Sequence, residues 1–400
     1  MVTVECVKPG AVPRARLIVI LGALSAFGPL SVDFYLPGLP KLTNDFHAGA
    51  SAGQLTLSAC ILGLAVGQLA AGPLSDRLGR RPPLVVGLVL YAVVSIACAL
   101  APSIWVLIVL RFLQGLAGAA GIVVSRSIVR DLSSGAGAAR LFSILFVVVS
   151  VVPILAPILG GQVLRLTSWR GLFVILAVVA AAILAAVLLW VHETLPPERR
   201  ARAGTGTGFS PLLHDRLFVA YAVVLSLSFA AMFTYISGSS FVLQDLYGIS
   251  PQVYGGVFGL NAFGLIVCSQ VNTMLVGRVA PARLLLIGVG AQAVAGTTLL
   301  VIVLAGGIGL AGILPCLFVV VSMLGFVIPN STALAMTDYP HAAGSASALI
   351  GAGQFVVGGL AAPLVGIAGR DTAVPMAVLM ASFAVGGLLA ALGARKVAPA

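Results

Sequence analysis

Long apolar runs recur along this chain and constrain its fold more than any other feature. Stretches of about 20 mainly apolar residues follow one another through the sequence, separated by short polar segments. Inside lipid the backbone must satisfy its own hydrogen bonds, so such runs predict helices. Only 8% of the 400 residues are charged, against about 25% in a typical soluble domain. The sequence therefore predicts an all-α membrane protein, because the alternating segments of a membrane β-barrel are not found.

Twelve transmembrane helices are predicted, six on each side of a hydrophilic stretch. The expected spans are 15–37, 52–73, 83–101, 104–125, 139–161, 169–191, 216–240, 252–273, 282–304, 309–335, 343–366 and 372–394. The stretch between the two sets contains three arginines and a Gly/Thr run, which is typical of a flexible linker. We expect an N-terminal six-helix bundle (1–191), a cytoplasmic linker (192–215) and a C-terminal six-helix bundle (216–400).

The positive charges predict the orientation of the chain. With the N-terminus inside, 17 of the 22 Lys and Arg residues fall in cytoplasmic segments and four fall in external loops. We therefore expect a multi-pass protein of the bacterial cytoplasmic membrane with both termini cytoplasmic. The net charge of +11 is spread over these loops rather than gathered on one face, so nucleic acid is not an expected partner. Asp33 interrupts the first run and more spans follow, so that run is expected to be a retained helix rather than a signal peptide.

The two halves share a weak internal repeat. At an offset of 198 residues, Gly79-Arg80 aligns with Gly277-Arg278, and Gly160-Gly161 aligns with Gly358-Gly359. Two matches at one offset, at equivalent places in two six-helix sets, are typical of a duplicated transporter. The two sets therefore predict pseudo-symmetric bundles.

A basic loop follows the second predicted span and carries an ordered pattern of small and charged residues. Gly79 permits a tight turn. Asp76 is expected to lie against the N-terminus of the helix that begins near Gly344, where the helix dipole favours a negative charge. Asp131, at the end of the fourth span, is expected to pair with one of the arginines. The plain alternative is a basic loop that only fixes topology. The residues of this candidate cytoplasmic gate are Gly72, Asp76, Arg77, Gly79, Arg80, Arg81 and Asp131.

This loop resembles the signature loop of the major facilitator superfamily. From about residue 25 to 200 the sequence resembles the drug:proton antiporter branch of that superfamily, especially the bicyclomycin and chloramphenicol resistance transporters. The resemblance implies two pseudo-symmetric six-helix bundles around a central path that opens alternately to each side. It also implies proton-coupled efflux of drug-like molecules, and it associates the basic loop with gating on the cytoplasmic side.

Two charged residues lie inside predicted spans. Asp33 lies late in the first span, and Arg111 lies in the external half of the fourth. A charge in the membrane is costly, and loss of water favours the neutral form of a carboxyl group. We expect the two residues to reach each other and to couple proton binding to helix packing. The resemblance favours this role, because related transporters carry an acidic residue at the first site and a proton-linked Arg at the second. The alternatives are an interfacial Asp close to Pro37 and a structural Arg bonded to backbone carbonyls.

The fifth span carries two prolines and a pair of small residues near its end. Prolines kink a helix, and glycines let helices approach closely. The segment resembles the antiporter signature of the drug-export branch, although Ala156 stands where a Gly commonly precedes the second proline. Ordinary close packing is the alternative. The residues of this motif are Pro153, Pro157, Gly160 and Gly161.

A central cavity is expected between the halves, lined by polar or aromatic residues of apolar spans. Such an apolar pocket with few polar groups suits amphiphilic molecules of drug size. The same residues are able to bond neighbouring helices instead. The candidates are Tyr35, Gln54, Ser58, Tyr235, Tyr254, Asn261 and Gln354.

The expected partners are a drug-like small molecule, protons and the lipid bilayer. The protein is expected to be a monomer. The five cysteines have no metal-binding spacing, no nucleotide-binding loop is found, and motifs of common hydrolases are missing. We therefore expect a transporter rather than an enzyme, with no metal and no cofactor beyond the proton gradient. The alternative function is proton-coupled import or export of a small metabolite on the same fold.

Overall fold

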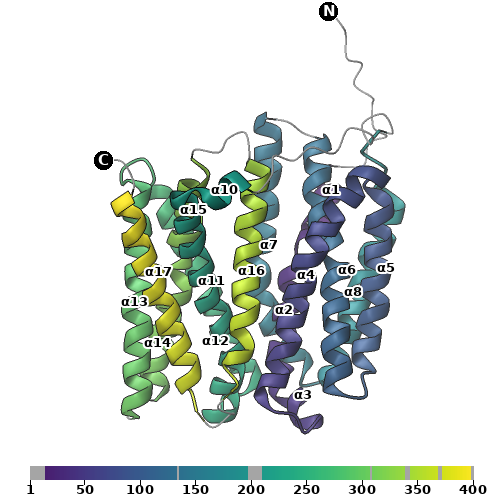
Figure 1. The fold of residues 1–400 in the computed structure, drawn as a ribbon. Helices are drawn as coiled ribbons and strands as arrows, with labels where there is room; N and C mark the ends of the chain where they lie inside the picture. The colour runs from purple at the N-terminus through teal and green to yellow at the C-terminus, as the bar shows by residue number, and fades with distance from the viewer. Residues whose placement is uncertain are drawn as a thin grey trace, which may run out of the picture.

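The computed structural model describes residues 14–132, 135–196, 210–306, 309–337, 343–367 and 372–397. In these ranges the regular structure is helical, apart from an isolated bridge between Val276 and Val279. The long helices run side by side along one axis (Figure 1). The start of α1 and the end of α17 lie at the same end of the molecule, which we call the terminal face. The short helix α3 lies at the other end, the opposite face.

The first half of the chain forms one group of packed helices. Its regular elements are α1 (Arg14–Ser25), α2 (Phe27–Asp33), the 3-10 turn η1 (Leu36–Gly38), α3 (Leu39–Asp45), α4 (Ala50–Leu78), α5 (Arg81–Ala99), α6 (Ile104–Leu132), α7 (Gly135–Val163) and α8 (Trp169–Trp190). Within this group α4 packs on α6, and α5 packs on both α6 and α8.

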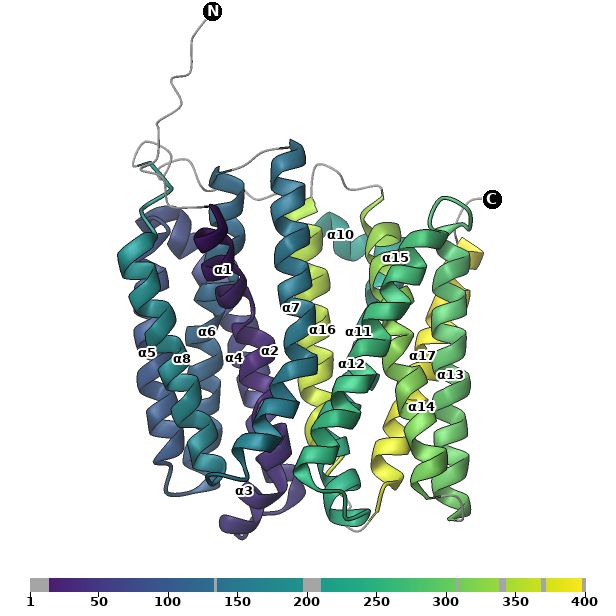
Figure 2. The same cartoon turned by 180° about the vertical axis from the view of Figure 1, so that it is seen from behind.

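The second half forms a matching group, seen from behind in Figure 2. Its elements are α10 (Ser210–His214), α11 (Arg216–Phe241), the π-helical turn η2 (Val242–Leu246), α12 (Pro251–Leu275), α13 (Pro281–Ala305), α14 (Leu310–Ser322), α15 (Leu324–Met336), α16 (Ala343–Leu364) and α17 (Val374–Val397). Here α17 packs on α11 and α13. Most of the predicted linker, residues 197–209, lies outside the described residues.

The described helices accommodate the twelve predicted spans. Nine of them are long and apolar enough to cross a membrane, counting α14 and α15 together, and the bent first span adds a tenth. α7 and α16 contribute the shorter apolar segments Val147–Val163 and Leu349–Leu364. The first span was predicted as one helix over 15–37, but it breaks at Ala26 with a bend of 48° and ends as a helix at Asp33. Pro29 falls in the first turn of α2, where a helix does not need its missing N–H.

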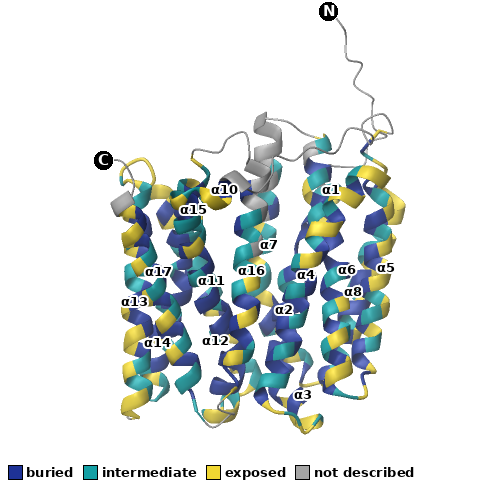
Figure 3. Ribbon diagram, viewed as in Figure 1, coloured by how far each residue is buried: buried dark blue, intermediate teal, exposed yellow. Residues whose placement is uncertain are grey.

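Apolar side chains face outward as well as inward. Figure 3 shows buried residues lining the faces between helices and exposed residues on the outside of the peripheral helices. Val86, Leu90 and Val93 are exposed on α5, and Val294 and Val301 are exposed on α13. A soluble protein rarely exposes large contiguous apolar patches, so these outer faces fit contact with lipid chains.

The internal repeat is visible in the backbone of two loops. Gly79, between α4 and α5, has φ 95°, and Gly277, between α12 and α13, has φ 93°. Residues with a side chain rarely adopt this conformation, whereas glycine does so readily. The equivalent turns of the two halves thus require glycine at the same repeat position.

Candidate functional site

A cavity of about 1220 Å³ lies between the two halves. Its walls come from α1, α2, α4, α6 and α7 on one side and from α11, α12, α14 and α16 on the other. The lining continues towards the terminal face along α4 to Leu69, along α6 to the exposed Arg126 and along α12 to Thr273. Asp33 and Tyr235 lie deeper, near the opposite face. The cavity therefore opens on the terminal face.

Two helix pairs close the molecule on the opposite side of the cavity. There α7 of the first half packs on α12 of the second, and α4 packs on α16. Gly161 is against the backbone of Pro251, so closely that an added Cβ would lie 2.7 Å from its carbonyl oxygen. Gly255 approaches the Pro157 carbonyl oxygen in the same way, at 2.6 Å for an added Cβ. Pro157 and Gly161 of the predicted antiporter motif thus lie in the closed contact between the halves, which we call the outer gate because the terminal face is predicted to be cytoplasmic. Pro153 lines the cavity instead, and Gly160 packs against the backbone of Phe34 in the same half.

Four hydrogen bonds between described residues join the two halves, and all lie at the outer gate. In each, a side chain of one half donates to a backbone carbonyl oxygen of the other. The pairs are Gln252 Nε2 to Gly161 O (2.8 Å), Ser240 Oγ to Leu36 O (2.7 Å), Ser51 Oγ to Pro363 O (3.3 Å) and Gln54 Nε2 to Ser237 O (3.4 Å). No ion pair between described residues crosses from one half to the other.

Asp33 and Arg126 are the charged residues of the cavity lining. Asp33 is 5% exposed and lies in the last turn of α2, where the helix dipole disfavours a negative charge. Among the described residues its carboxyl group makes no hydrogen bond and no ion pair. Burial without a partner makes the ionised form costly. The site therefore holds a carboxyl group for which gaining a proton, or binding a cation, is favourable.

Arg111 is completely buried and does not pair with Asp33. Its Nη2 donates to the Ser31 carbonyl oxygen at 2.7 Å, its Nη1 donates to Gln114 Oε1, and its guanidinium lies 4.3 Å from the centre of the Tyr35 ring. Because α2 ends two residues after Ser31, that carbonyl has no partner in a further helical turn, and a cation at a helix C-terminus is favourable. Here Arg111 has the contacts of the structural alternative, a carbonyl-bonded Arg.

Polar residues of the second half surround the deep end of the cavity. Tyr235 on α11 is 1% exposed, and its ring stacks on Phe258 with the centroids 5.4 Å apart. Asn261 Nδ2 donates to the Tyr235 hydroxyl oxygen at 2.8 Å. Behind them, the hydroxyls of Ser239 and Tyr254 are 3.2 Å apart. Tyr235 lines the cavity together with Asp33, so polar groups of the second half share the deep end of the cavity with the acid of the first.

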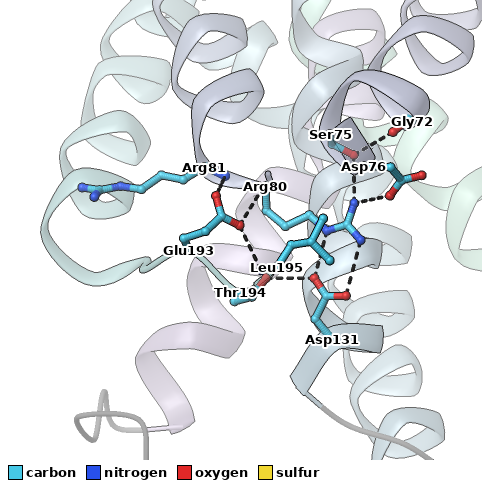
Figure 4. Close-up of polar contacts among 9 residues, drawn as sticks. All are labelled: Gly72, Ser75, Asp76, Arg80, Arg81, Asp131, Glu193, Thr194 and Leu195. Atoms are coloured by element: carbon cyan, nitrogen blue, oxygen red, sulfur yellow. Dashed lines mark hydrogen bonds and ion pairs between the residues drawn. The ribbon is translucent and has the colours of Figure 1, made fainter. Parts of the chain in front are cut away.

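The predicted gate loop forms an ionic cluster on the terminal face (Figure 4). Arg80 Nε donates to Asp131 Oδ2 at 2.9 Å, and Nη1 donates to Asp76 and to Ser75 Oγ. Arg80 is 7% exposed. Burial alone lowers the pKa of its guanidinium, but the hydrogen bonds to Asp131 and Asp76 outweigh it and raise the pKa above its usual value. Arg80 therefore stays charged, and the expected pairing of Asp131 with a loop arginine is observed.

Glu193 completes this cluster and was given no role by the sequence analysis. Its carboxylate accepts the backbone N–H groups of Arg80 (2.8 Å) and Arg81 (3.1 Å), where α5 begins. An anion at a helix N-terminus is stabilising. Thr194 Oγ1 also donates to Asp131 at 2.9 Å. The cluster joins α4, α5 and α6 to the segment after α8, all within the first half.

The remaining residues of the predicted gate take no part in ionic contacts between described residues. Arg77 is exposed and has no such partner, and the Gly72 carbonyl accepts from Ser75 Oγ at 2.9 Å. Gly79 makes the turn described above. No hydrogen bond between described residues joins Asp76 to the helix that begins near Gly344, and its carboxylate accepts from Arg80 instead.

Comparisons with known proteins agree with this architecture. The sequence profile described as Major Facilitator Superfamily matches residues 20–363. The chain belongs to the Major Facilitator Superfamily. It is 40% identical over 394 residues to an uncharacterized MFS-type transporter, YdgK, of Bacillus subtilis strain 168, which covers 97% of this chain and 98% of the relative. The prediction of a transporter rather than an enzyme is confirmed by this membership.

Two groups of relatives in the superfamily are named for drug resistance. A bicyclomycin resistance protein homolog of Haemophilus influenzae is 30% identical, covering 93% of this chain and 94% of the relative. The multidrug resistance protein MdtL of Escherichia coli O157:H7 is 29% identical, covering 72% of this chain and 73% of the relative. The resemblance to the drug-efflux branch is thereby confirmed.

Solved structures of other MFS transporters share the fold. An inward-facing, occupied bacterial homolog of the human lysosomal transporter Spinster superimposes with a TM-score of 0.76 at 15% identity, covering 97% of both chains. A D-xylose–proton symporter superimposes with a TM-score of 0.71 at 18% identity, covering 96% of this chain and 97% of the other. The predicted major-facilitator fold is confirmed.

The cavity of this MFS chain is lined by fewer of the predicted residues than expected. Of the seven candidates, Tyr235 and Gln354 line it. Tyr35 donates to or accepts from Thr56 beneath Arg111, Gln54 lies at the outer gate, and Ser58 is buried in α4. Tyr254 and Asn261 lie behind Tyr235. Four of these five residues hydrogen-bond to buried backbone or side-chain groups instead, whereas the Ser58 hydroxyl has no hydrogen-bond partner among the described residues.

A group of aromatic residues on the second half of the cavity wall was not predicted. It consists of Phe229, Phe233, Phe258 and Phe355, with Phe233 in ring contact with both Phe229 and Phe355. The spacing of Phe229 and Phe233 places both on one face of α11. Together with Met232 they give the cavity a large apolar wall opposite Asp33.

Proposed function

We propose that this chain exports drug-like small molecules across the bacterial cytoplasmic membrane in exchange for protons. The observation that carries the proposal is the cavity between the halves, with Asp33 as the acidic residue of its lining and a largely aromatic and aliphatic wall. Pockets for drug-sized ligands have volumes of about 300–1000 Å³ and few polar groups. A cavity of about 1220 Å³ has room for such a ligand.

The orientation of the chain that this proposal uses follows from the charge of the loops. The terminal face carries Arg77, Arg80 and Arg81, and the basic residues of other loops predicted to be cytoplasmic belong to the same side. With that face in the cytoplasm, the described conformation is open inward and closed at the outer gate. A molecule dissolved in the cytoplasm or inner leaflet then enters the cavity beside Asp33.

The proposed cycle uses Asp33 as the proton carrier. In the outward-open conformation a proton from outside binds the Asp33 carboxylate and neutralises it, which favours release of the cargo outward. The chain returns to the inward-open conformation, and the proton leaves Asp33 to the cytoplasm. Arg111 acts as a positioning residue here, because it holds the end of α2 at Ser31 and so fixes where the Asp33 carboxyl lies.

The names of the relatives support the class of cargo. Proteins named for bicyclomycin and multidrug resistance match this chain over most of its length. Chloramphenicol and bicyclomycin are therefore the first molecules to test. Transport of a small metabolite on the same fold is the competing outcome, because the solved relatives include a sugar–proton symporter.

The test compares wild type and Asp33→Asn in an efflux-deficient bacterial host at equal expression. We expect wild type to raise resistance to chloramphenicol or bicyclomycin and Asp33→Asn to remove that resistance. Asp245→Asn is the matched control, since Asp245 is exposed on η2 and does not line the cavity. In everted vesicles an exporter accumulates drug when the membrane is energised. Full transport against a gradient by Asp33→Asn would overturn the proposed coupling.

A further inference from the structure

A second, smaller cavity lies on the outside of the first half, at the bend of the first span. Its volume is about 390 Å³, and its described lining comes from α1, α2, α7, α8 and the break at Ala26. Figure 2 shows α1 between α7 and α8. Ala23 and Ala26 have side chains too small to fill the space between these helices. The cavity, which we call the side pocket, opens to the outside, since Val19 in its lining is 69% exposed.

Every residue in the described lining of the side pocket is aliphatic. A bound water needs about two to four polar partners, so an acyl chain of the surrounding lipid is the favoured occupant. Along the first span the lining runs from Ile18 to Leu30, which is about 18 Å of helix before the bend shortens it. The hydrocarbon of one leaflet is about 15 Å thick. The side pocket therefore has the length of one acyl chain. Its lining residues are Ile18, Val19, Ala23, Ala26, Leu30, Val148, Val152, Val179 and Ile183.

A cationic group lies at the end of the side pocket nearest the terminal face. Arg16, two residues before Ile18 on α1, is exposed, and its guanidinium lies 5.6 Å from the centre of the Trp190 ring of α8. Tryptophan is typical of the membrane–water interface, so this contact indicates the level of the lipid headgroups. No ion pair between described residues involves Arg16. A guanidinium is able to donate two parallel N–H bonds to a phosphate group.

We propose that the side pocket binds one acyl chain of an anionic phospholipid from the leaflet on the terminal side, with Arg16 bonded to the phosphate of that lipid. An anionic phospholipid has no ammonium group of its own to compete with Arg16 for the phosphate. The positive charge and the apolar pocket thus select a charge and a chain at the same place. This site is separate from the central cavity, and it does not depend on which molecule the chain transports.

The helices that line the side pocket also form a wall of the central cavity. On α2, Pro29 lines the central cavity and Leu30 lines the side pocket. On α7, Pro153 lines the central cavity and Val152 lines the side pocket. The wall between the two cavities is therefore one helix thick. A bound acyl chain supports this wall from behind, next to the helix that carries Asp33.

The test counts lipids bound to the purified protein by native mass spectrometry. Phosphatidylglycerol and phosphatidylcholine with the same acyl chains are added separately. We expect wild type to bind its first phosphatidylglycerol about fivefold more tightly than its first phosphatidylcholine, since a basic residue beside anionic lipid contributes about 1 kcal/mol. Arg16→Gln changes an exposed side chain and should remove that preference. Ala23→Phe fills the side pocket and should weaken the first binding step for both lipids several-fold.

The matched control is Arg283→Gln. Arg283 is exposed near the start of α13, and the exposed Ile287, Val294 and Val301 follow it on the same face of that helix. No residue of α13 lines the side pocket. A general attraction of basic residues for anionic lipid acts equally at Arg16 and Arg283, whereas a built site exists only at Arg16. Arg283→Gln should therefore keep the wild-type preference.

Several results would overturn the proposal. A preference that persists in Arg16→Gln, or that Arg283→Gln removes to the same extent, would show that Arg16 does not select the lipid. Binding of the first lipid that Ala23→Phe leaves unchanged would place that lipid outside the side pocket. Displacement of phosphatidylglycerol by excess chloramphenicol would assign the side pocket to cargo, and a lipid-free dimer would assign it to a second copy of the chain.

Discussion

Replacing Gly161 by alanine should weaken the outer gate without touching the cavity. An added Cβ would lie 2.7 Å from the Pro251 carbonyl oxygen, so α7 and α12 have to separate at this point. Overpacking of a tight contact costs about 1–3 kcal/mol. The bond from Gln252 to the Gly161 carbonyl, worth about 1 kcal/mol, is strained at the same time. The total of about 2–4 kcal/mol acts only on the closed conformation of the gate.

That free energy is large compared with the free-energy difference between two conformations that are both populated. Because 1.4 kcal/mol changes an equilibrium tenfold, about 2–4 kcal/mol shifts the ratio of closed to open gates by roughly 30-fold to 1000-fold. The distance across the gate can be measured by pulsed electron–electron resonance between spin labels at Leu166→Cys and Val253→Cys. Both positions are exposed near the gate. Wild type should give mainly a short distance, and Gly161→Ala should add a longer population.

The matched control is Gly256→Ala. Gly256 lies on the same helix as Gly255, but an added Cβ would meet nothing within 4 Å. Its distance distribution should equal that of wild type. If Gly161→Ala also keeps the wild-type distribution, the close approach of the two helices does not hold the gate shut, and the reasoning from packing is wrong.

Three further substitutions, with Arg77→Ala as a control, test the first half. Arg80→Ala should lower the free energy of unfolding by about 3 kcal/mol, because it leaves Asp131 without its positively charged partner. Arg77→Ala in the same loop should have no measurable effect, and thermal unfolding in detergent compares the two variants. Glu193→Gln should cost about 1 kcal/mol in the same assay, since it removes the negative charge at the start of α5. Arg111→Lys should abolish most drug export in vesicles while protein yield is kept, because a single ammonium group cannot reproduce the fork that holds Ser31 and Gln114.

The fold was predictable because the membrane imposes a length and a composition on each span. Apolar runs of about 20 residues identify helices whatever their neighbours are. A pair between Asp131 and one of the loop arginines was also predictable, since a charge at the edge of the membrane has few partners within reach, and the structure identifies this arginine as Arg80. In contrast, Phe233 on the cavity wall and Val294 on the lipid face look alike in a sequence, because both environments accept apolar side chains.

The partner of Arg111 was not predictable for a related reason. Opposite charges on neighbouring helices suggest an ion pair, but the outcome depends on where α2 ends. The break after Asp33 leaves the Ser31 carbonyl without a helical partner, and Arg111 fills that vacancy. Pro37 signals that the helix ends nearby, but it permits a helix as far as Leu36, so the sequence did not place the end at Asp33. The acid is thereby left facing the cavity, where proton exchange is possible.

The distribution of bond strengths fits a chain that alternates between two conformations. The ion pairs between described residues join helices within the first half, as Arg80 does with Asp131. The described hydrogen bonds between the halves are neutral, and each contributes about 1 kcal/mol net. Four such bonds total about 4 kcal/mol, a sum comparable with the coupling free energies of about 1–3 kcal/mol that link ligand binding to conformational change. Charged networks at the outer gate would raise the free energy needed to open it, whereas neutral side-chain-to-backbone bonds keep that free energy close to what the binding of a small ligand supplies.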